Sequence, residues 1–252
     1  MRIRHGLSTA IAIMLLAGTT AAASTMARTL IARSLADPAR VEDRAQDARR
    51  HPTELVALTE LKPGQRVVDL IPGSGYWTRI FSRIVGPAGH VYGIWPQPYA
   101  AEAAGDLRHL QALARQYSNI SALVEPGSHL TSPQPVDVVW TSQNYHDYND
   151  KFMGSPGSLA LARDAYRLLK PGGVFVVVDH AAAPGHGERD TDTLHRIERA
   201  TVIREATMAG FRLAGASDAL RNPADPLTIK VFDPQIRGHT SQFALKFRKP
   251  VR

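Results

Sequence analysis

Short apolar segments alternate with longer helix-forming segments from Lys62 onward, and this alternation limits the chain to few folds. The clearest apolar run is Val174 to Asp179 (VFVVVD), a composition expected of a strand that is buried on both faces. Strands separated by helices predict an α/β fold with a doubly wound, mostly parallel sheet. Strands are expected at residues 66–71, 89–95, 120–124, 136–141 and 174–179, and helices at residues 76–85, 100–117, 159–169 and 193–208.

The two ends of the chain depart from this alternation. Thr29 to Leu61 is mostly helix-forming and is interrupted at Asp37-Pro38 and at His51-Pro52, where proline suits the first turn of a helix. We expect these N-terminal helices to pack over the sheet. Near the other end, Leu227 to Phe232 and Gln242 to Phe247 predict a C-terminal antiparallel strand pair.

The first residues have the order of a secretory signal peptide. Arg2 and Arg4 precede the apolar stretch Ala10 to Gly18, and small residues follow at Ala21 and Ala23. This order predicts cleavage after about Ala23 and a periplasmic or secreted protein. The alternative is an uncleaved anchor helix, but the apolar run is shorter than the roughly 20 residues that a bilayer crossing needs. The expected organisation is a signal peptide at 1–23, a helical segment at 24–61 and an α/β domain at 62–252.

Charge and cysteine content exclude several classes of function. The formal net charge is +7, but the basic residues are scattered apart from short groups such as Arg49-Arg50. This distribution favours a solvated surface over nucleic-acid binding. The chain has no cysteine, which excludes disulfides, a thiolate nucleophile and a thiolate metal site. We therefore expect a small-molecule substrate, no nucleic-acid partner and no stable membrane insertion after cleavage, with the oligomeric state open.

One stretch joins a strand to a helix through a glycine turn. It is VVDLIPGSGYWT, Val67 to Thr78, in which Gly73 and Gly75 let the backbone turn sharply and approach a ligand. Ligands of doubly wound sheets bind beyond the carboxyl ends of the strands. The turn therefore indicates a ligand site, and the alternative is a tight turn that binds nothing.

Three stretches resemble the class I S-adenosylmethionine-dependent methyltransferases. They are DLIPGSG (Asp69 to Gly75), the polar loop after the fourth strand, and the turn LKPGG before the fifth strand. The resemblance implies a Rossmann-like fold and S-adenosylmethionine as the cofactor. The chain is also similar to a group of exported bacterial predicted methyltransferases in NYHD, DTDTLHRIE, LRNPADP, VFDPQIRG and FALKFRKP.

The same resemblance implies a donor site, with three departures from the family pattern. Asp69 would contact the methionine ammonium group. Ile71 stands where the family commonly has glycine, and Trp95 stands where an acid accepts hydrogen bonds from the ribose hydroxyls, for which Glu102 is the candidate substitute. The loop after the third strand lacks the aspartate that faces the adenine amino group, for which Glu125 is the candidate substitute. The expected donor residues are Asp69, Ile71, Pro72, Gly73, Ser74, Gly75, Trp95 and Asn144. The alternative hypothesis is an exported protein that kept the fold, lost the donor site and binds or acts on another ligand.

The resemblance places the loop after the fourth strand beside the transferred methyl group. His146 is the first candidate for a general base because histidine titrates near neutral pH. Asp147 would fix its tautomer or orient the acceptor, and Asn144 and Tyr145 offer hydrogen bonds. We therefore assign catalytic roles to His146, Asp147 and Tyr145. The alternative is a loop whose polar side chains cap the next helix or bind water.

A second polar group follows the fifth strand. It consists of Asp179, His180, His186, Asp190, Asp192, His195 and Arg196. These residues could line an acceptor pocket, or His146, His180 and His195 could hold a metal such as zinc with a carboxylate. A third interpretation is that the histidines are simply hydrogen-bonded. The spacing fits no compact metal motif, so the sequence predicts no metal site.

Overall fold

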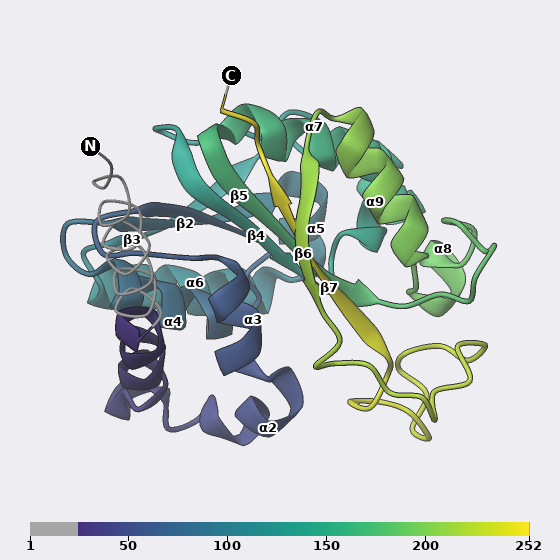
Figure 1. The fold of residues 1–252 in the computed structure, drawn as a ribbon, viewed down its shortest axis with the longest axis horizontal. Helices are drawn as coiled ribbons and strands as arrows, with labels where there is room; N and C mark the ends of the chain where they lie inside the picture. The colour runs from purple at the N-terminus through teal and green to yellow at the C-terminus, as the bar shows by residue number, and fades with distance from the viewer. Residues whose placement is uncertain (1–24, 252) are drawn as a thin grey trace, which may run out of the picture.

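The computed structural model describes residues 25–251, so the expected signal peptide lies outside the described residues. One sheet of seven strands runs through the molecule in the order β3-β2-β1-β4-β5-β7-β6 (Figure 1). The first five strands pair in parallel and β7 pairs antiparallel with β5 and β6. The predicted doubly wound sheet with a C-terminal antiparallel pair is therefore confirmed.

The strands are β1 (Arg66–Leu70), β2 (His90–Pro96), β3 (Ile120–Glu125), β4 (Val136–Ser142), β5 (Leu169–His180), β6 (Arg212–Ser217) and β7 (Gln242–Arg248). The α-helices are residues 25–35, α2 (Asp47–Arg50), α3 (Pro52–Leu58), α4 (Tyr76–Val85), α5 (Gln97–Glu102), α6 (Ala104–Gln116), α7 (Ser158–Leu168), α8 (Thr191–Leu194) and α9 (Arg199–Met208). The 3-10 helices are η1 (Pro38–Arg40), η2 (Arg44–Gln46), η3 (His146–Asn149) and η4 (Lys151–Met153). No described helix is long and apolar enough to cross a bilayer.

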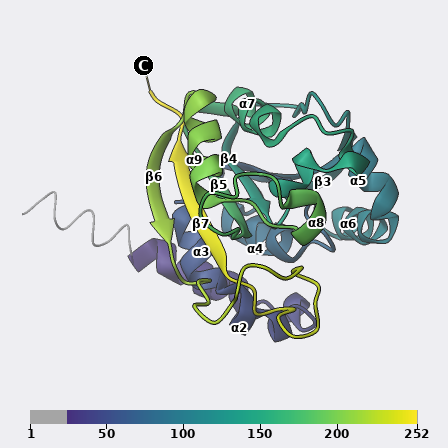
Figure 2. The same cartoon turned by 90° about the vertical axis from the view of Figure 1, so that its right-hand side faces the viewer.

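Helices cover both faces of the sheet, and each face has its own aromatic core (Figure 2). Phe175 of β5 lies opposite Val139 of β4, so it points away from the neighbouring Trp140. Trp140 packs against Trp77 of α4, with ring centroids 4.8 Å apart. On the other face, Phe175 packs against Phe211, which follows α9, with ring centroids 5.3 Å apart. The sheet is therefore buried on both sides, as its continuous apolar strands predict.

Two expected helices are each broken in the structure. The segment expected as one helix at 100–117 forms α5 and α6, because Ala103 leaves helical geometry with φ −107° and ψ 37°. The segment expected at 193–208 forms α8 and α9, because His195 takes a left-handed conformation with φ 54°. Both breaks lie next to the candidate site, and they change which side chains reach it.

The closing strand pair contains a different strand from the expected one. Residues 227–232 are irregular, whereas Arg212–Ser217 forms β6 beside β7. The strand β6 lies at the edge of the sheet and has mostly exposed side chains, so it lacks a clear apolar pattern.

The turn expected at Lys170 to Gly173 lies inside β5, which begins at Leu169 and shifts its register with β4 there.

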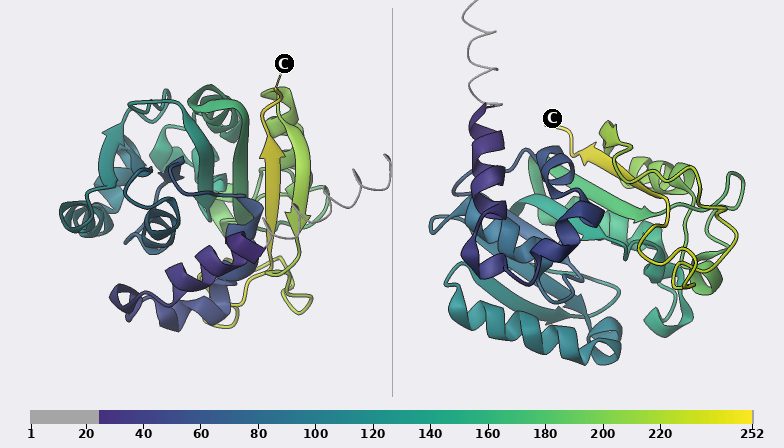
Figure 3. Two further views of the ribbon diagram at one scale, coloured as in Figure 1. Left: turned by 60° about the vertical axis from the view of Figure 1, so that its left-hand side comes forward. Right: turned by 90° about the horizontal axis from the view of Figure 1, so that it is seen from below.

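A long irregular segment, residues 218–241, joins β6 to β7; we call it the closing segment. It lies beside α2 at one end of the molecule (Figure 3). The guanidinium group of Arg196 donates hydrogen bonds to both oxygens of Asp225, at 2.9 and 3.0 Å, and both side chains are fully buried. Arg196 also donates to the carbonyl groups of Ala181 and Ile229. This buried ion pair anchors the closing segment to the body of the protein.

Replacing Asp225 with alanine should lower the free energy of unfolding by about 3–5 kcal/mol, because the charge of Arg196 would stay buried without its partner. The matched control is Lys151→Ala, which breaks the exposed Lys151–Asp192 pair and should cost less than about 1 kcal/mol. Urea unfolding measures both changes. Equal losses in the two variants would contradict the anchoring role of Arg196 and Asp225.

Candidate active site

A cavity of about 220 Å³ lies at the carboxyl ends of β1, β2 and β4, and we call it the first cavity. Its walls include Asp69 of β1, then Ile71, Pro72 and Gly73 after that strand, together with Trp95, Tyr99 and Asn144. Most of the expected donor residues are thus brought together. Two are not: Ser74 is exposed, and neither it nor Gly75 is part of the cavity wall.

The two glycines of the turn have different roles. Gly73 has φ 57°, and a Cβ atom added to it would meet nothing within 4 Å, so its backbone faces open space. Gly75 has φ 93°, and a Cβ atom added to it would lie 2.8 Å from the Leu113 side chain of α6. Gly73 therefore leaves room for a ligand, whereas Gly75 allows α4 and α6 to pack closely.

Ile71 takes a backbone conformation that a β-branched residue rarely adopts. Its φ is 52°, and its backbone N–H donates to the carbonyl group of Ile94 at 2.9 Å. Such conformations persist only where the surrounding structure enforces them, and they cluster at functional sites. Ile71 therefore adopts the positive φ that a glycine at this position would adopt readily.

Asp69 lies at the floor of the first cavity and is 1% exposed. Thr78 Oγ1 donates a hydrogen bond of 2.6 Å to Asp69 Oδ2. Burial raises the pKa of Asp69 to about 7, against the opposing effects of this hydrogen bond and of the Arg50 charge. The Asp69 carboxyl group therefore changes charge near neutral pH.

The wall after β2 contains Trp95 in place of an acid. Trp95 is fully buried, and its Nε1–H has no hydrogen-bond partner among the described residues. An acid does reach this cavity from α6, namely Asp106, whose side chain is exposed. The expected substitutes lie elsewhere: Glu102 is not part of the wall, and Glu125 accepts a hydrogen bond of 2.5 Å from Thr131 Oγ1.

Sequence reasoning missed Asp106 because one uninterrupted helix was expected there. The break at Ala103 starts α6 anew, and Asp106 falls in its first turn. No local signal placed Asp106 at the ligand site, because its position depends on that break.

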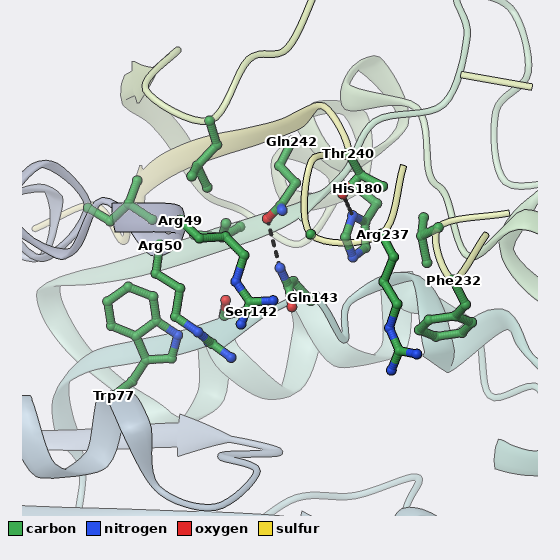
Figure 4. A pocket seen from close by; sticks show the side chains of 15 residues that line it. Arg49, Arg50, Trp77, Ser142, Gln143, His180, Phe232, Arg237, Thr240 and Gln242 are labelled. Carbon is green, nitrogen blue, oxygen red and sulfur yellow. Dashed lines mark hydrogen bonds between the residues drawn. The ribbon is translucent and has the colours of Figure 1, made fainter. Parts of the chain in front are cut away.

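A second cavity, of about 210 Å³, lies between α2, the end of β5 and the closing segment (Figure 4). It shares four wall residues with the first cavity, so the two cavities adjoin. The shared residues are Arg50, Trp77, Ser142 and Gln143. Gln143 has φ 67° and donates its backbone N–H to the Val178 carbonyl group at 2.7 Å, while its Nε2 donates to Gln242 Oε1 at 3.0 Å.

The second cavity is strongly cationic. Arg49, Arg50 and Arg237 line it, and its wall contains no carboxylate (Figure 4). None of the three arginines forms an ion pair with a described residue. Burial and the neighbouring charge of Arg49 lower the pKa of Arg50, whose guanidinium carbon lies 4.6 Å from the Tyr76 ring centroid. Unpaired guanidinium groups around a cavity indicate an anionic ligand.

His180 is the histidine that lines the second cavity. Its Nδ1 lies 2.8 Å from Thr240 Oγ1, and its Nε2 has no hydrogen-bond partner among the described residues (Figure 4). Burial lowers the pKa of His180 to about 4, so the ring is neutral at physiological pH. A neutral imidazole with one free nitrogen can orient an acceptor by a hydrogen bond.

The predicted catalytic residues lie beside the cavities rather than in their walls. His146 is 2% exposed, and its Nδ1 is 2.8 Å from Asp179 Oδ1. Its Nε2 is 3.0 Å from Asp147 Oδ1 and 3.3 Å from His195 Nδ1. Burial opposes protonation of His146, but the charges of Asp179 and Asp147 outweigh it and raise the pKa well above its usual value. The general-base role of His146 stays a prediction.

The other expected site residues are distributed between the cavity wall and the core. Tyr145 is fully buried and donates its hydroxyl hydrogen to Glu205 Oε2 at 2.9 Å, away from both cavities. Asn144 lines the first cavity and its Nδ2 lies 3.2 Å from the Tyr99 hydroxyl group. His186 pairs with Asp190 at 2.5 Å, outside both walls.

Comparison with known proteins links the chain to methyltransferases. Residues 47–139, less than half of the 252 residues, match the family protein-L-isoaspartate(D-aspartate) O-methyltransferase (PCMT). The protein-L-isoaspartate O-methyltransferase of Ignicoccus hospitalis is 32% identical over 123 residues, which are 49% of this chain and 51% of that relative. The chain thus matches about half the length of this curated relative.

Solved structures share the arrangement of helices and strands. A SAM-dependent methyltransferase from Aquifex aeolicus superposes with a TM-score of 0.56 at 18% identity, covering 88% of this chain and 98% of that one. The [4+2]-cyclase SpnF superposes with a TM-score of 0.59 at 23% identity, covering 82% of each chain. The fold is that of the class I S-adenosylmethionine-dependent methyltransferases. Because a cyclase shares this fold, the reaction has to be argued from the site.

Asp69→Asn should remove one source of pH dependence from folding stability. The pKa of Asp69 is raised from 3.8 to about 7 in the folded state, so the folded chain binds more protons than the unfolded chain between these values. This group alone therefore lowers the free energy of unfolding by up to about 1.4 kcal/mol per unit as pH rises through that range. Urea unfolding at pH 5 and pH 7.5 should show a flatter dependence in the variant. Exposed Asp218→Asn is the control, and an unchanged slope in Asp69→Asn would contradict the assignment.

Proposed function

We propose that this protein is a methyltransferase that binds S-adenosylmethionine in the first cavity and a methyl acceptor in the second. The observation that carries the proposal is the adjoining pair of cavities, which share Arg50, Trp77, Ser142 and Gln143. Methyl transfer is an in-line displacement, so donor and acceptor must be held end to end. Two cavities that meet at a shared wall supply this arrangement.

The wall of the first cavity fits the proposed donor. Gly73 leaves space for close approach of the ligand, and ionised Asp69 can attract the methionine ammonium group. Trp95 belongs to the cavity wall although it is fully buried, and its indole N–H has no partner among the described residues. Asp106 can accept hydrogen bonds from ribose hydroxyl groups. These contacts favour a retained donor site over the alternative that the site has been lost.

The three arginines of the second cavity favour an acceptor with a carboxylate or phosphate group. S-adenosylmethionine, when bound, supplies an electrophilic methyl group whose sulfur leaves as a neutral thioether. An acceptor oxygen that is already anionic carries the attacking electron pair and needs no general base. Arg49 and Arg237 would then hold the anionic group, and neutral His180 would orient it. This account agrees with the position of His146 outside the cavity wall.

Two acceptor classes fit this chemistry. The relative from Ignicoccus hospitalis is named for protein L-isoaspartate, and the family match covers β1, β2 and the first residues of β4. An isoaspartyl peptide is therefore the first acceptor to assay, and small carboxylates or phosphates are the second.

Export of the protein stays a proposal from the sequence of residues 1–23, which N-terminal sequencing of the exported protein would test.

Asp106→Asn should weaken the binding of S-adenosylmethionine about tenfold, because hydrogen bonds to a charged group contribute about 1.5–3 kcal/mol and the exposed position of Asp106 keeps the effect at the lower end. Glu102→Gln is the matched control, since Glu102 is a nearby exposed acid outside the cavity wall. Calorimetric titration with S-adenosylmethionine and S-adenosylhomocysteine measures both. Equal weakening in the two variants would contradict the role of Asp106, and a flat titration of the wild type at millimolar ligand would contradict the donor site.

Arg237→Gln should raise the KM for an anionic acceptor about tenfold without changing the affinity for the methyl donor. Arg237 lines the second cavity, whereas Arg221 lies on the same closing segment outside it, so Arg221→Gln is the control. The assay follows labelled methyl transfer to an isoaspartyl peptide, its aspartyl counterpart, and small carboxylates paired with their amides. Equal methylation of carboxylates and amides would contradict an anionic acceptor.

A further inference from the structure

The geometry points to a binding site for one divalent transition-metal ion, of the zinc class, formed by His146, Asp147 and His195 with Asp150 beside them. His146 and Asp147 lie in η3, Asp150 directly follows η3, and His195 directly follows α8. The inference is independent of the proposed methyltransferase activity, because none of these four residues lines either cavity.

Three potential ligand atoms lie at the separations that a small cation requires. His146 Nε2 is 3.0 Å from Asp147 Oδ1 and 3.3 Å from His195 Nδ1, and the last two atoms are 3.6 Å apart. Zinc binds nitrogen and oxygen ligands at about 2.0–2.2 Å, so the ligands of a tetrahedral site lie about 3.3–3.6 Å from one another. The observed distances bracket this value. Two imidazoles and one carboxylate favour zinc or a similar transition metal over magnesium or calcium.

Asp150 supplies an independent observation. Its side chain is 1% exposed, and its Oδ1 has no hydrogen-bond partner among the described residues. Its Oδ2 lies 4.0 Å from His195 Nδ1, so the carboxylate lies next to one of the three ligand atoms. A hydrogen-bonded network of histidines leaves this buried oxygen unsatisfied, which is costly. A bound cation would neutralise it as a fourth ligand or through a coordinated water.

The surroundings of His146 are those of a metal ligand. Its Nδ1 lies 2.8 Å from Asp179 Oδ1, so a carboxylate orients the ring and leaves Nε2 facing Asp147 and His195. Asp179 is itself fixed, because its oxygens accept the backbone N–H groups of His146 and His180 at 2.9 and 2.7 Å. Carboxylate–histidine pairs of this kind set the tautomer of metal-binding histidines.

The residues that would bind the cation also contact the walls of both cavities. Asp147 Oδ2 lies 3.4 Å from Asn144 Nδ2, and Asn144 lines the first cavity. The His195 ring packs on Phe232 of the second cavity, with ring centroids 4.9 Å apart. His195 is 21% exposed, which gives an ion access from solvent. His180 is not part of this group of ligand atoms; its ring lines the second cavity and its Nδ1 pairs with Thr240.

The test is calorimetric titration of untagged, chelator-treated full-length protein with Zn²⁺, repeated with Co²⁺ to record the absorption of tetrahedral coordination. We expect one ion per chain. His195→Ala should weaken binding by more than about 100-fold, the upper end for loss of a second-shell partner. His186→Ala, which removes a histidine paired with Asp190 outside the cluster, should bind as the wild type does.

Folding of each variant is checked by thermal unfolding without metal. If His195→Ala does not fold, Asp150→Ala replaces it, with a loss of at least about tenfold expected. Absence of stoichiometric binding to the wild type would overturn the inference. Equal losses in His195→Ala and His186→Ala, or unchanged affinity in the folded cluster variant, would overturn it as well.

Discussion

The parallel pairing of β1 with β4 and of β4 with β5 decides where every candidate functional side chain lies. Leu70 is opposite Thr141, and Ser142 is opposite Val178, so these three strands end at one edge of the sheet. The backbone N–H of Gln143 extends the ladder by one more bond to Val178. The loops that follow these strands therefore all begin at this edge of the sheet, and the two cavities lie beside them.

The two cavities differ in charge although they share a wall. The first has the carboxyl groups of Asp69 and Asp106, and the second has Arg49 and Arg237 with no carboxylate. In the proposed reaction, a donor with a cationic sulfonium and ammonium meets an anionic acceptor at the junction. The protein would hold each reactant by charges opposite to its own, and Arg50 at the junction contributes to both walls.

Much of the fold follows from the sequence because its signals are local. The apolar strands and the proline interruptions at Pro38 and Pro52 each depend on a few neighbouring residues, and the structure has helices beginning at both prolines. The edge strand β6 was missed because an exposed strand that pairs with one neighbour needs little apolar pattern. The breaks at Ala103 and His195 were also missed, because neither residue is a glycine or a proline that would mark the end of a helix.

The candidate site was predictable only in part for the same reason. Asp69 to Gly73 are consecutive residues that run from the end of β1 into the following turn, so their shared position could be inferred. The cationic second cavity combines Arg49 with Arg237, which are distant in sequence, and Arg49-Arg50 alone is typical of a solvated surface. His195 meets His146 because a left-handed residue ends α8, whereas an unbroken helix was expected there. Contacts of this kind have no local signal in one sequence.

The central claim is that the adjoining cavities hold a methyl donor and its acceptor on opposite sides of Gln143. A crystal structure of the protein with S-adenosylhomocysteine tests it most directly. The account predicts the adenosine group between Trp95 and Asp106, the amino group near Asp69, and the sulfur directed toward the second cavity past Gln143. An adenosyl group bound elsewhere, or a sulfur directed away from the arginine-lined cavity, would contradict it.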